Sequence, residues 1–192
     1  MTKTKKVVRT IVVAGVLCAL ASIATFSAFT SQADNPGNNV TAGTVTLTSN
    51  SPATAMYNMS AAKPGDSAVK CIKISYTGSL ASTVKFYSPD TVGSLGQYVN
   101  LQVEKGTQTG SPVNGDCTGF SAAGGNLFNN TLDNLPNSGT AVTATNPTGG
   151  AAWATNDAVA YRVTATLSAS APNAAQGLTT NSHTLRWEAS NN

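Results

Sequence analysis

The chain has 192 residues, of which 10% are charged and 41% are hydrophobic, so threonine, serine, asparagine and glutamine must form most of its surface. Its net charge is +3, and residues 1–28 hold four basic groups and no acidic one, so removing those four charges leaves −1. The later basic residues form no cluster, which excludes a nucleic-acid backbone as a partner. A disordered chain is also disfavoured, because such chains usually carry high net charge.

The N-terminus has the layout of a secretory signal peptide. Basic residues precede the apolar residues 11–24, and small residues follow. We predict a signal peptide at residues 1–28, cut after Ala28, with Ala33 as the alternative because Ser-Gln-Ala is a conventional small-x-small site. A third alternative is no cleavage, since residues 10–33 are uncharged and a span needs about 20 residues. Their serine and threonine content makes a poor anchor, so membrane contact is expected only before cleavage.

Residues 29–41 are predicted to be a flexible segment, because Asn-Pro-Gly-Asn-Asn occupies positions 35–39. An extended segment can add to an open sheet edge of another molecule and gain backbone hydrogen bonds. A head-to-tail contact that does not close gives filaments. Phe29, Thr30, Val40 and Thr41 are therefore the candidate assembly residues. The alternative is an ordinary disordered terminus.

Residues 42–192 are predicted to form one all-β domain with long polar loops. Period-two alternation of apolar and polar residues predicts half-buried strands at 40–48, 69–76, 83–87, 98–104, 158–169 and 182–189. Residues 127–132 are either a strand or a helical turn, and 106–125 and 137–150 are predicted loops. Without helices for crossovers, the strands favour an antiparallel β-sandwich. Jelly-roll and immunoglobulin-like strand orders both fit the pattern.

The three cysteines divide into one that is removed and two that remain. Cys18 lies in the apolar signal core. Cys71 and Cys117 are left, and an even number of cysteines in an exported chain predicts a disulfide. It would pin the 106–125 loop, and closing about 45 residues corresponds to about 4 kcal/mol in the chain-entropy model. The alternative is two buried free thiols.

No catalytic, cofactor-binding or metal-binding residue is predicted. Zinc peptidases need about three protein ligands and a general base, whereas the chain has a single histidine, His183. We expect His183 to be packed or half-exposed near a strand. The aspartates are not spaced as in a calcium-binding loop, and no Gly-x-Ser-x-Gly elbow is present.

Several stretches carry a family resemblance through their order and spacing. They are the signal with residues 26–30, Ala-Gly-Thr at 42–44, Lys-Pro-Gly-Asp at 63–66, Thr-Gly-Ser-Leu at 77–80, Tyr-Arg-Val-Thr at 161–164, Asn-Ala-Ala-Gln-Gly at 173–177 and Arg-Trp-Glu-Ala at 186–189. Together they resemble the TasA/camelysin family of exported bacterial proteins, whose precursors use the SipW-dependent type of signal peptide. The pair Cys71 and Cys117 resembles the variant found in high-GC Gram-positive bacteria.

The resemblance implies a jelly-roll sandwich that is exported to the cell surface or the extracellular matrix. TasA-like members polymerise into biofilm fibres in which the N-terminal segment of one subunit completes the sheet of the next. We therefore expect a fibre-forming structural protein, not an enzyme, whose partners are itself, other matrix proteins and a signal peptidase of the SipW type. A monomeric surface adhesin that binds through the 106–125 and 137–150 loops is the alternative. Camelysin-like members are described as surface metallopeptidases, which is the less favoured reading.

Overall fold

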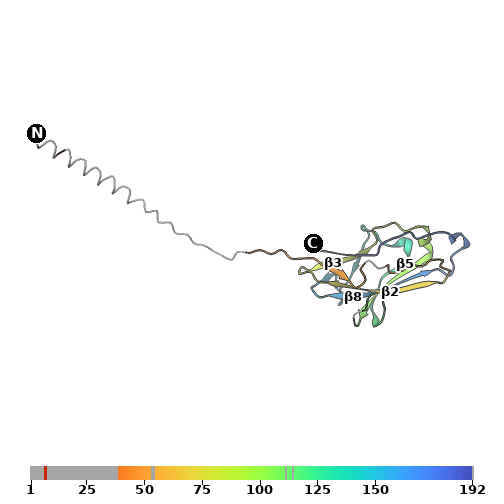
Figure 1. Cartoon of the computed structure of the whole chain (residues 1–192), viewed down its shortest axis with the longest axis horizontal. Coiled ribbons are helices and arrows are strands. Elements are labelled where there is room, and N and C mark those ends of the chain that lie inside the picture. Colours follow the sequence, from red (N-terminus) through yellow and green to blue (C-terminus); the bar gives the residue numbers. More distant parts are fainter. Residues whose placement is uncertain (1–6, 8–38, 53–54, 111, 114, 192) are drawn as a thin grey trace. The chain divides into compact units, whose positions relative to one another are not determined.

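The computed structural model describes residue 7 and residues 39–52, 55–110, 112–113 and 115–191. The chain separates into two units, Met1–Thr41 and Ala42–Asn192, and the strands found among the described residues all belong to the second (Figure 1). Both predicted cleavage sites, together with Phe29 and Thr30, lie outside the described residues. Within the described part of the chain, no helix combines the length and hydropathy needed to cross a bilayer.

The second unit is built from two antiparallel sheets, as the strand pattern predicted. The five-stranded sheet has, in spatial order, β1 (Leu47–Ser49), β2 (Ser67–Tyr76), β8 (Ala158–Leu167), β4 (Val99–Gln108) and β5 (Phe120–Thr131). The other sheet contains β3 (Ser82–Tyr87), β6 (Val142–Ala144), β7 (Ala152–Trp153) and β9 (Arg186–Ser190). The remaining regular elements described in this unit are short 3₁₀ helices at Ser94–Tyr98, Leu132–Asn134 and Asn173–Ala175.

β3 is the central strand of the smaller sheet. β9 pairs with residues 83–87 of β3, whereas β6 pairs with 84–86 and β7 with 82–83. Because a strand has only two edges and the β9 pairing overlaps both of the others, β6 and β7 share the edge opposite β9. β6 and β7 are therefore two parts of one interrupted edge strand, and the residues between them form a loop.

The two sheets bury their inner faces against each other. β8 shows the cause most clearly, because its alternate residues Val159, Tyr161 and Val163 are at most 1% exposed. The Trp187 ring of β9 lies 4.8 Å from the Phe86 ring and 5.3 Å from the Tyr161 ring, measured between centroids. Since Phe86 belongs to the smaller sheet and Tyr161 to the larger, these contacts join the layers of an antiparallel sandwich.

The first predicted strand is largely wrong. Residues 40–48 were expected to be extended through their length, but β1 covers only Leu47–Ser49. The preceding residues bond to a turn instead, since the Thr77 amide donates to Thr46 O at 2.9 Å and the Leu80 amide to Thr44 O at 3.1 Å. Similarly, the predicted last strand at 182–189 begins only at Arg186 in β9.

The predicted loop at 106–125 is also wrong at both ends. β4 continues to Gln108 and β5 starts at Phe120, with register shifts on either side of Glu104. Glycine makes this pairing possible, because a β-carbon on Gly106 would lie 2.3 Å from Ser121 O. Bulges break the period-two pattern, and the many glycines give these strand ends a composition typical of a loop. The sequence pattern therefore did not indicate a strand here.

The later segments need smaller corrections. Residues 127–131 belong to β5, so the strand alternative is right there, and Leu132 begins a 3₁₀ helix. The predicted loop at 137–150 contains the short strand β6. The predicted strands at 69–76, 83–87, 98–104 and 158–169 correspond to β2, β3, β4 and β8.

Candidate functional site

The second unit has a groove of about 820 Å³ between the edges of its two sheets. β1 and β2 line one side, and the residues that lead into β9 line the other. The covering segment, residues 55–62, has no regular structure and contributes Met56, Tyr57 and Met59. Ile72, Ile74, Val99, Leu167, Leu185 and Trp187 provide an apolar lining. The groove is therefore a partly open extension of the hydrophobic core.

Both strands that flank the groove end their sheets. β1 is the terminal strand of the larger sheet, and β9 pairs with β3 alone. Thr46 O and the Asn50 amide both bond toward β2, at 2.9 Å and 3.2 Å. Because backbone direction alternates along an antiparallel strand, the backbone groups of Leu47 and Ser49 point away from β2. Among the described residues, no backbone bond to the outward groups of Leu47 and Ser49 is present, so β1 offers a hydrogen-bonding edge beside an apolar groove.

A tyrosine–histidine pair joins two of the segments that line the groove. The Nδ1 atom of His183 lies 3.0 Å from the carbonyl oxygen of Asn181, and a carbonyl oxygen only accepts hydrogen bonds. In a neutral imidazole, Nδ1 therefore carries the proton and Nε2 accepts from the hydroxyl of Tyr57. Burial raises the pKa of Tyr57 above its ordinary value, so the phenol keeps the proton that it donates.

The groove also contains a buried polar group without a partner. Ser51 is 4% exposed, and among the described residues its hydroxyl makes no hydrogen bond. Ser51 lines the groove just after β1. A buried hydroxyl that is left unpaired costs about 1–3 kcal/mol, so a polar group that entered the groove would gain from meeting it.

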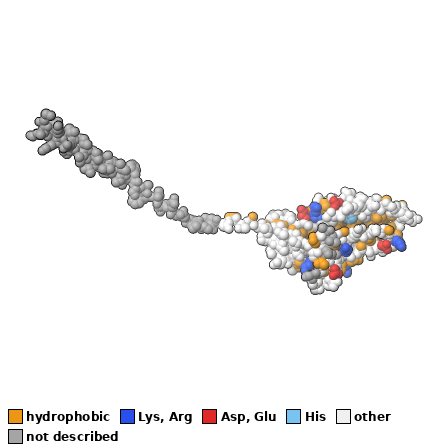
Figure 2. Space-filling model, in the orientation of Figure 1, with side chains coloured by type: hydrophobic (Ala, Val, Ile, Leu, Met, Phe, Trp, Pro, Cys, Tyr) orange, Lys and Arg blue, Asp and Glu red, His pale blue; other side chains and the backbone are white. Residues whose placement is uncertain are grey.

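The predicted assembly residues are placed only in part. Val40 is 96% exposed and Thr41 is also exposed. Figure 2 shows that uncharged polar groups and backbone cover most of the visible face of the second unit, with scattered charged groups. Burying the exposed side chain of Val40 against another molecule would remove apolar surface from water, which is favourable.

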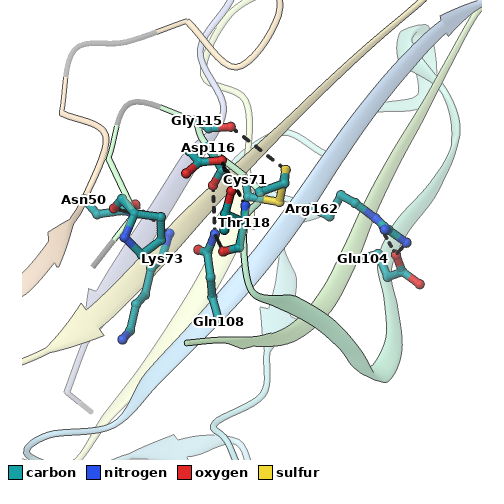
Figure 3. The surroundings of a disulfide bond; sticks show 11 residues. Asn50, Cys71, Lys73, Glu104, Gln108, Gly115, Asp116, Thr118 and Arg162 are labelled. Carbon is teal, nitrogen blue, oxygen red and sulfur yellow. Dashed lines mark hydrogen bonds and ion pairs between the residues drawn. A yellow bond between two sulfur atoms is a disulfide. The ribbon is translucent and has the colours of Figure 1, made fainter. Parts of the chain in front are cut away.

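The predicted disulfide between Cys71 and Cys117 is present (Figure 3). It ties the segment between β4 and β5 to β2, with the two α-carbons 4.9 Å apart. The Cys71 amide donates to Gly115 O at 3.0 Å, and the Gln108 side chain donates to Asp116 O at 2.7 Å. This connection is therefore held by several bonds, in contrast to the long loop expected there.

Asp116 caps the same connection. Its Oδ1 atom accepts from the backbone amide of Thr118 at 2.9 Å and from the Thr118 hydroxyl at 2.8 Å. These bonds favour the carboxylate and lower the pKa of Asp116. The side chain has a local structural role and faces no other carboxylate in the polar contacts shown (Figure 3).

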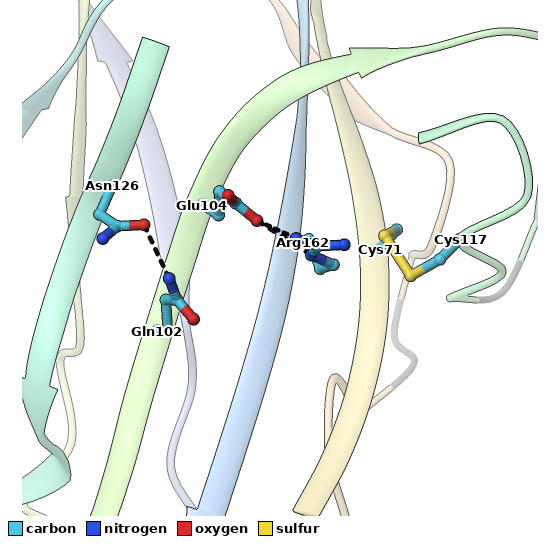
Figure 4. A network of polar contacts seen from close by, with 6 residues as sticks. All are labelled: Cys71, Gln102, Glu104, Cys117, Asn126 and Arg162. Carbon is cyan, nitrogen blue, oxygen red and sulfur yellow. Dashed lines mark hydrogen bonds and ion pairs between the residues drawn. A yellow bond between two sulfur atoms is a disulfide. The ribbon is translucent and has the colours of Figure 1, made fainter. Parts of the chain in front are cut away.

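The outer face of the larger sheet carries a row of polar contacts (Figure 4). Arg162 of β8 forms an ion pair with Glu104 of β4, and its guanidinium lies 5.0 Å from the centre of the Phe120 ring. Gln102 donates to the Asn126 side chain at 3.0 Å. The Arg162 and Glu104 side chains are 42% and 20% exposed. Such a pair stabilises by about 0–1 kcal/mol, so this row supports the sheet and offers no reactive group.

The described residues do not assemble a peptidase metal centre. No group of three or more His, Cys, Asp or Glu side chains is gathered in the part of the chain that the structure describes. The one histidine of the chain bonds Asn181 through Nδ1 and Tyr57 through Nε2, and the chain has no second histidine to complete a zinc site. Asp66 and Asp90 each accept from a backbone amide, of Lys63 and Thr184 respectively, at 2.8 Å. This donor set does not fit a zinc site with three ligands and a general base.

Together, the fold and the groove define an all-β sandwich with one disulfide and an open apolar groove at its edge. A family model described as camelysin metallo-endopeptidase matches residues 2–100. The match covers more than half of the chain, and the chain belongs to this family, the TasA/camelysin family. No curated protein matches the chain. The matched region includes β1, β2 and β3 and ends at the start of β4, so His183 and Cys117 lie beyond it.

Proposed function

We propose that the protein is an exported structural subunit of the cell surface or biofilm matrix that polymerises head to tail. In this proposal, residues 29–41 of one copy add as a strand to the groove of the next. The observation that supports it is the outer edge of β1 beside an apolar groove, where the outward backbone groups of Leu47 and Ser49 have no backbone partner among the described residues. Main-chain hydrogen bonds would supply affinity, and the groove would accept alternate side chains.

The segment has the composition that such a strand needs. Phe29, Ser31 and Ala33 alternate with Thr30 and Gln32, so one face is apolar or small and the other is polar. The aromatic ring of Phe29 could fill part of the groove, where burial of a large side chain contributes about 1.5–3 kcal/mol. Donor and acceptor lie in different parts of the chain, so the contact need not close and can extend into a filament.

A structural role is better supported than the activity in the family description. That description names a metallo-endopeptidase, but the described residues lack a fitting ligand set. A groove flanked by sheet edges suits an extended backbone. Export is part of the proposal and is supported by the signal-like N-terminus and the disulfide.

Two variants separate the donor from the acceptor. The full-length gene would be expressed in a Gram-positive host with a SipW-type signal peptidase, and the processed protein would be examined by light scattering and negative-stain microscopy. Deleting residues 29–39 removes the donor and leaves the groove. Ser49→Pro removes an outward amide of β1 and leaves its hydrogen bonds to β2. Ser49→Ala is the matched control, because it keeps the amide.

We expect filaments from the wild type and from Ser49→Ala, and none from either test variant. The deletion variant should also shorten wild-type filaments when the two are mixed, since it can accept a strand but cannot donate one. Filaments in both test variants would reject strand donation at this groove. A wild-type protein that stays monomeric would instead favour the surface-adhesin alternative.

A further inference from the structure

The groove gathers the soft metal donors of the chain. Apart from Met1, the chain has two methionines and one histidine, and Met56, Met59 and His183 all line the groove. Met56 is 8% exposed, and Met59 is half-buried and packed against the core. Both methionines and the histidine therefore line one groove, although His183 is more than 120 residues from either methionine in the sequence.

Tyr57 lies between the two methionines in the sequence and bonds the histidine. It lies next to Met56 and two residues before Met59, so their α-carbons lie within about 8 Å of its own. Its hydroxyl bonds Nε2 of His183, and the two ring centroids are 5.5 Å apart. Since Nδ1 is occupied by Asn181 O, Nε2 is the nitrogen that could bind a metal. Methionine has three flexible side-chain bonds, so its sulfur can adapt to a nearby ion.

The chemistry of the lining selects the kind of ion. Among its described residues there is no Asp, Glu or Cys, and Arg186 is the one charged side chain. A divalent cation would find no negative charge to offset its loss of water. Thioether ligands favour monovalent copper, and imidazole also suits copper.

We propose that the groove is a binding site for monovalent copper, with Met56, Met59 and His183 as the ligands. Tyr57 competes with the ion for Nε2 of His183, so binding requires the tyrosine hydroxyl to release that nitrogen. The site differs from a zinc peptidase centre in its ligands and in its lack of a general base. It stands on the groove residues alone and does not depend on fibre assembly.

The test uses the full chain in detergent with Cys18→Ser, which removes the thiol outside the disulfide. Cu(I), kept reduced with ascorbate, is titrated against the chelator bathocuproine disulfonate. We expect one Cu(I) per chain, and at least about tenfold weaker binding in Met59→Leu and in His183→Gln, because even residues that only orient ligands cost that much. Tyr57→Phe should bind at least as tightly as the parent.

Leu185→Ile is the matched control, since it changes the same groove without removing a donor atom, and it should bind like the parent. The proposal is overturned if the chelator keeps all of the copper, or if Met59→Leu binds as tightly as Leu185→Ile. X-ray absorption at the copper edge tests the parent protein without any substitution. Sulfur neighbours support the assignment, and a shell of nitrogen and oxygen alone overturns it.

Discussion

Removing the disulfide should cost much of the stability of the second unit. The bond between Cys71 and Cys117 spans a sequence separation of 46 residues. For a loop of that length, the chain-entropy model gives about 4 kcal/mol at 25 °C. At about 2–4 °C per kcal/mol for a chain of this size, Cys71→Ala/Cys117→Ala should melt about 8–16 °C below the parent. Urea denaturation measures the free energy of unfolding directly. Parent and variant both carry Cys18→Ser, so that no third cysteine is present.

The single variants show whether the effect comes from the crosslink. Cys71 is fully buried, whereas Cys117 is only half-buried, so a loss of packing would make Cys71→Ala much worse than Cys117→Ala. A loss of the crosslink predicts that both single variants, kept reduced, match the double variant. Their effects would then be strongly non-additive. A double variant within about 1 kcal/mol of the parent would refute the argument that the bond acts on the unfolded chain.

Three further predictions concern the larger sheet and its connection. Gly106→Ala should destabilise by about 1–3 kcal/mol in urea, because the new methyl group would meet Ser121 O at 2.3 Å; wild-type stability would contradict the close approach. Glu104→Gln should lower the free energy of unfolding by less than about 1 kcal/mol, since the ion pair of Glu104 with Arg162 is partly exposed. A larger decrease would contradict the view that this ion pair is only a weak surface contact. Hydrogen bonds lower the pKa of Asp116 from its ordinary value of 3.8. The ionised side chain therefore stabilises the folded protein above that value, and this contribution is lost as the pH falls through the lowered pKa. Asp116→Asn should therefore weaken the acid dependence of the melting temperature below pH 3.8, and an unchanged profile would exclude this role.

Local pattern was a good guide where strands are regular. In β8, alternation of Val163 and Ala165 with Arg162 and Thr164 predicted the buried face correctly. The pattern failed where the backbone is irregular. β5 contains Gly124 and Gly125 with positive φ angles of 98° and 78°, and its register shifts against β4 hide the period of two.

The candidate site was much harder to predict than the strands. The segment that carries Tyr57 has no periodicity, and its partner His183 lies 126 residues further along the chain. Each residue looks ordinary in its own surroundings. A groove arises only when two sheet edges are brought together, and no local sequence signal reports that distance.

The sequence by itself determined the all-β class, most strand positions, the disulfide pair and the family. These features follow from local periodicity, from the count of cysteines and from short motifs in order. The tertiary structure decided where β4 and β5 continue through glycine bulges and which edges remain open. It alone brought Tyr57 and the two methionines to His183 in one groove, because packing of the two layers, and no local preference, sets which distant side chains meet.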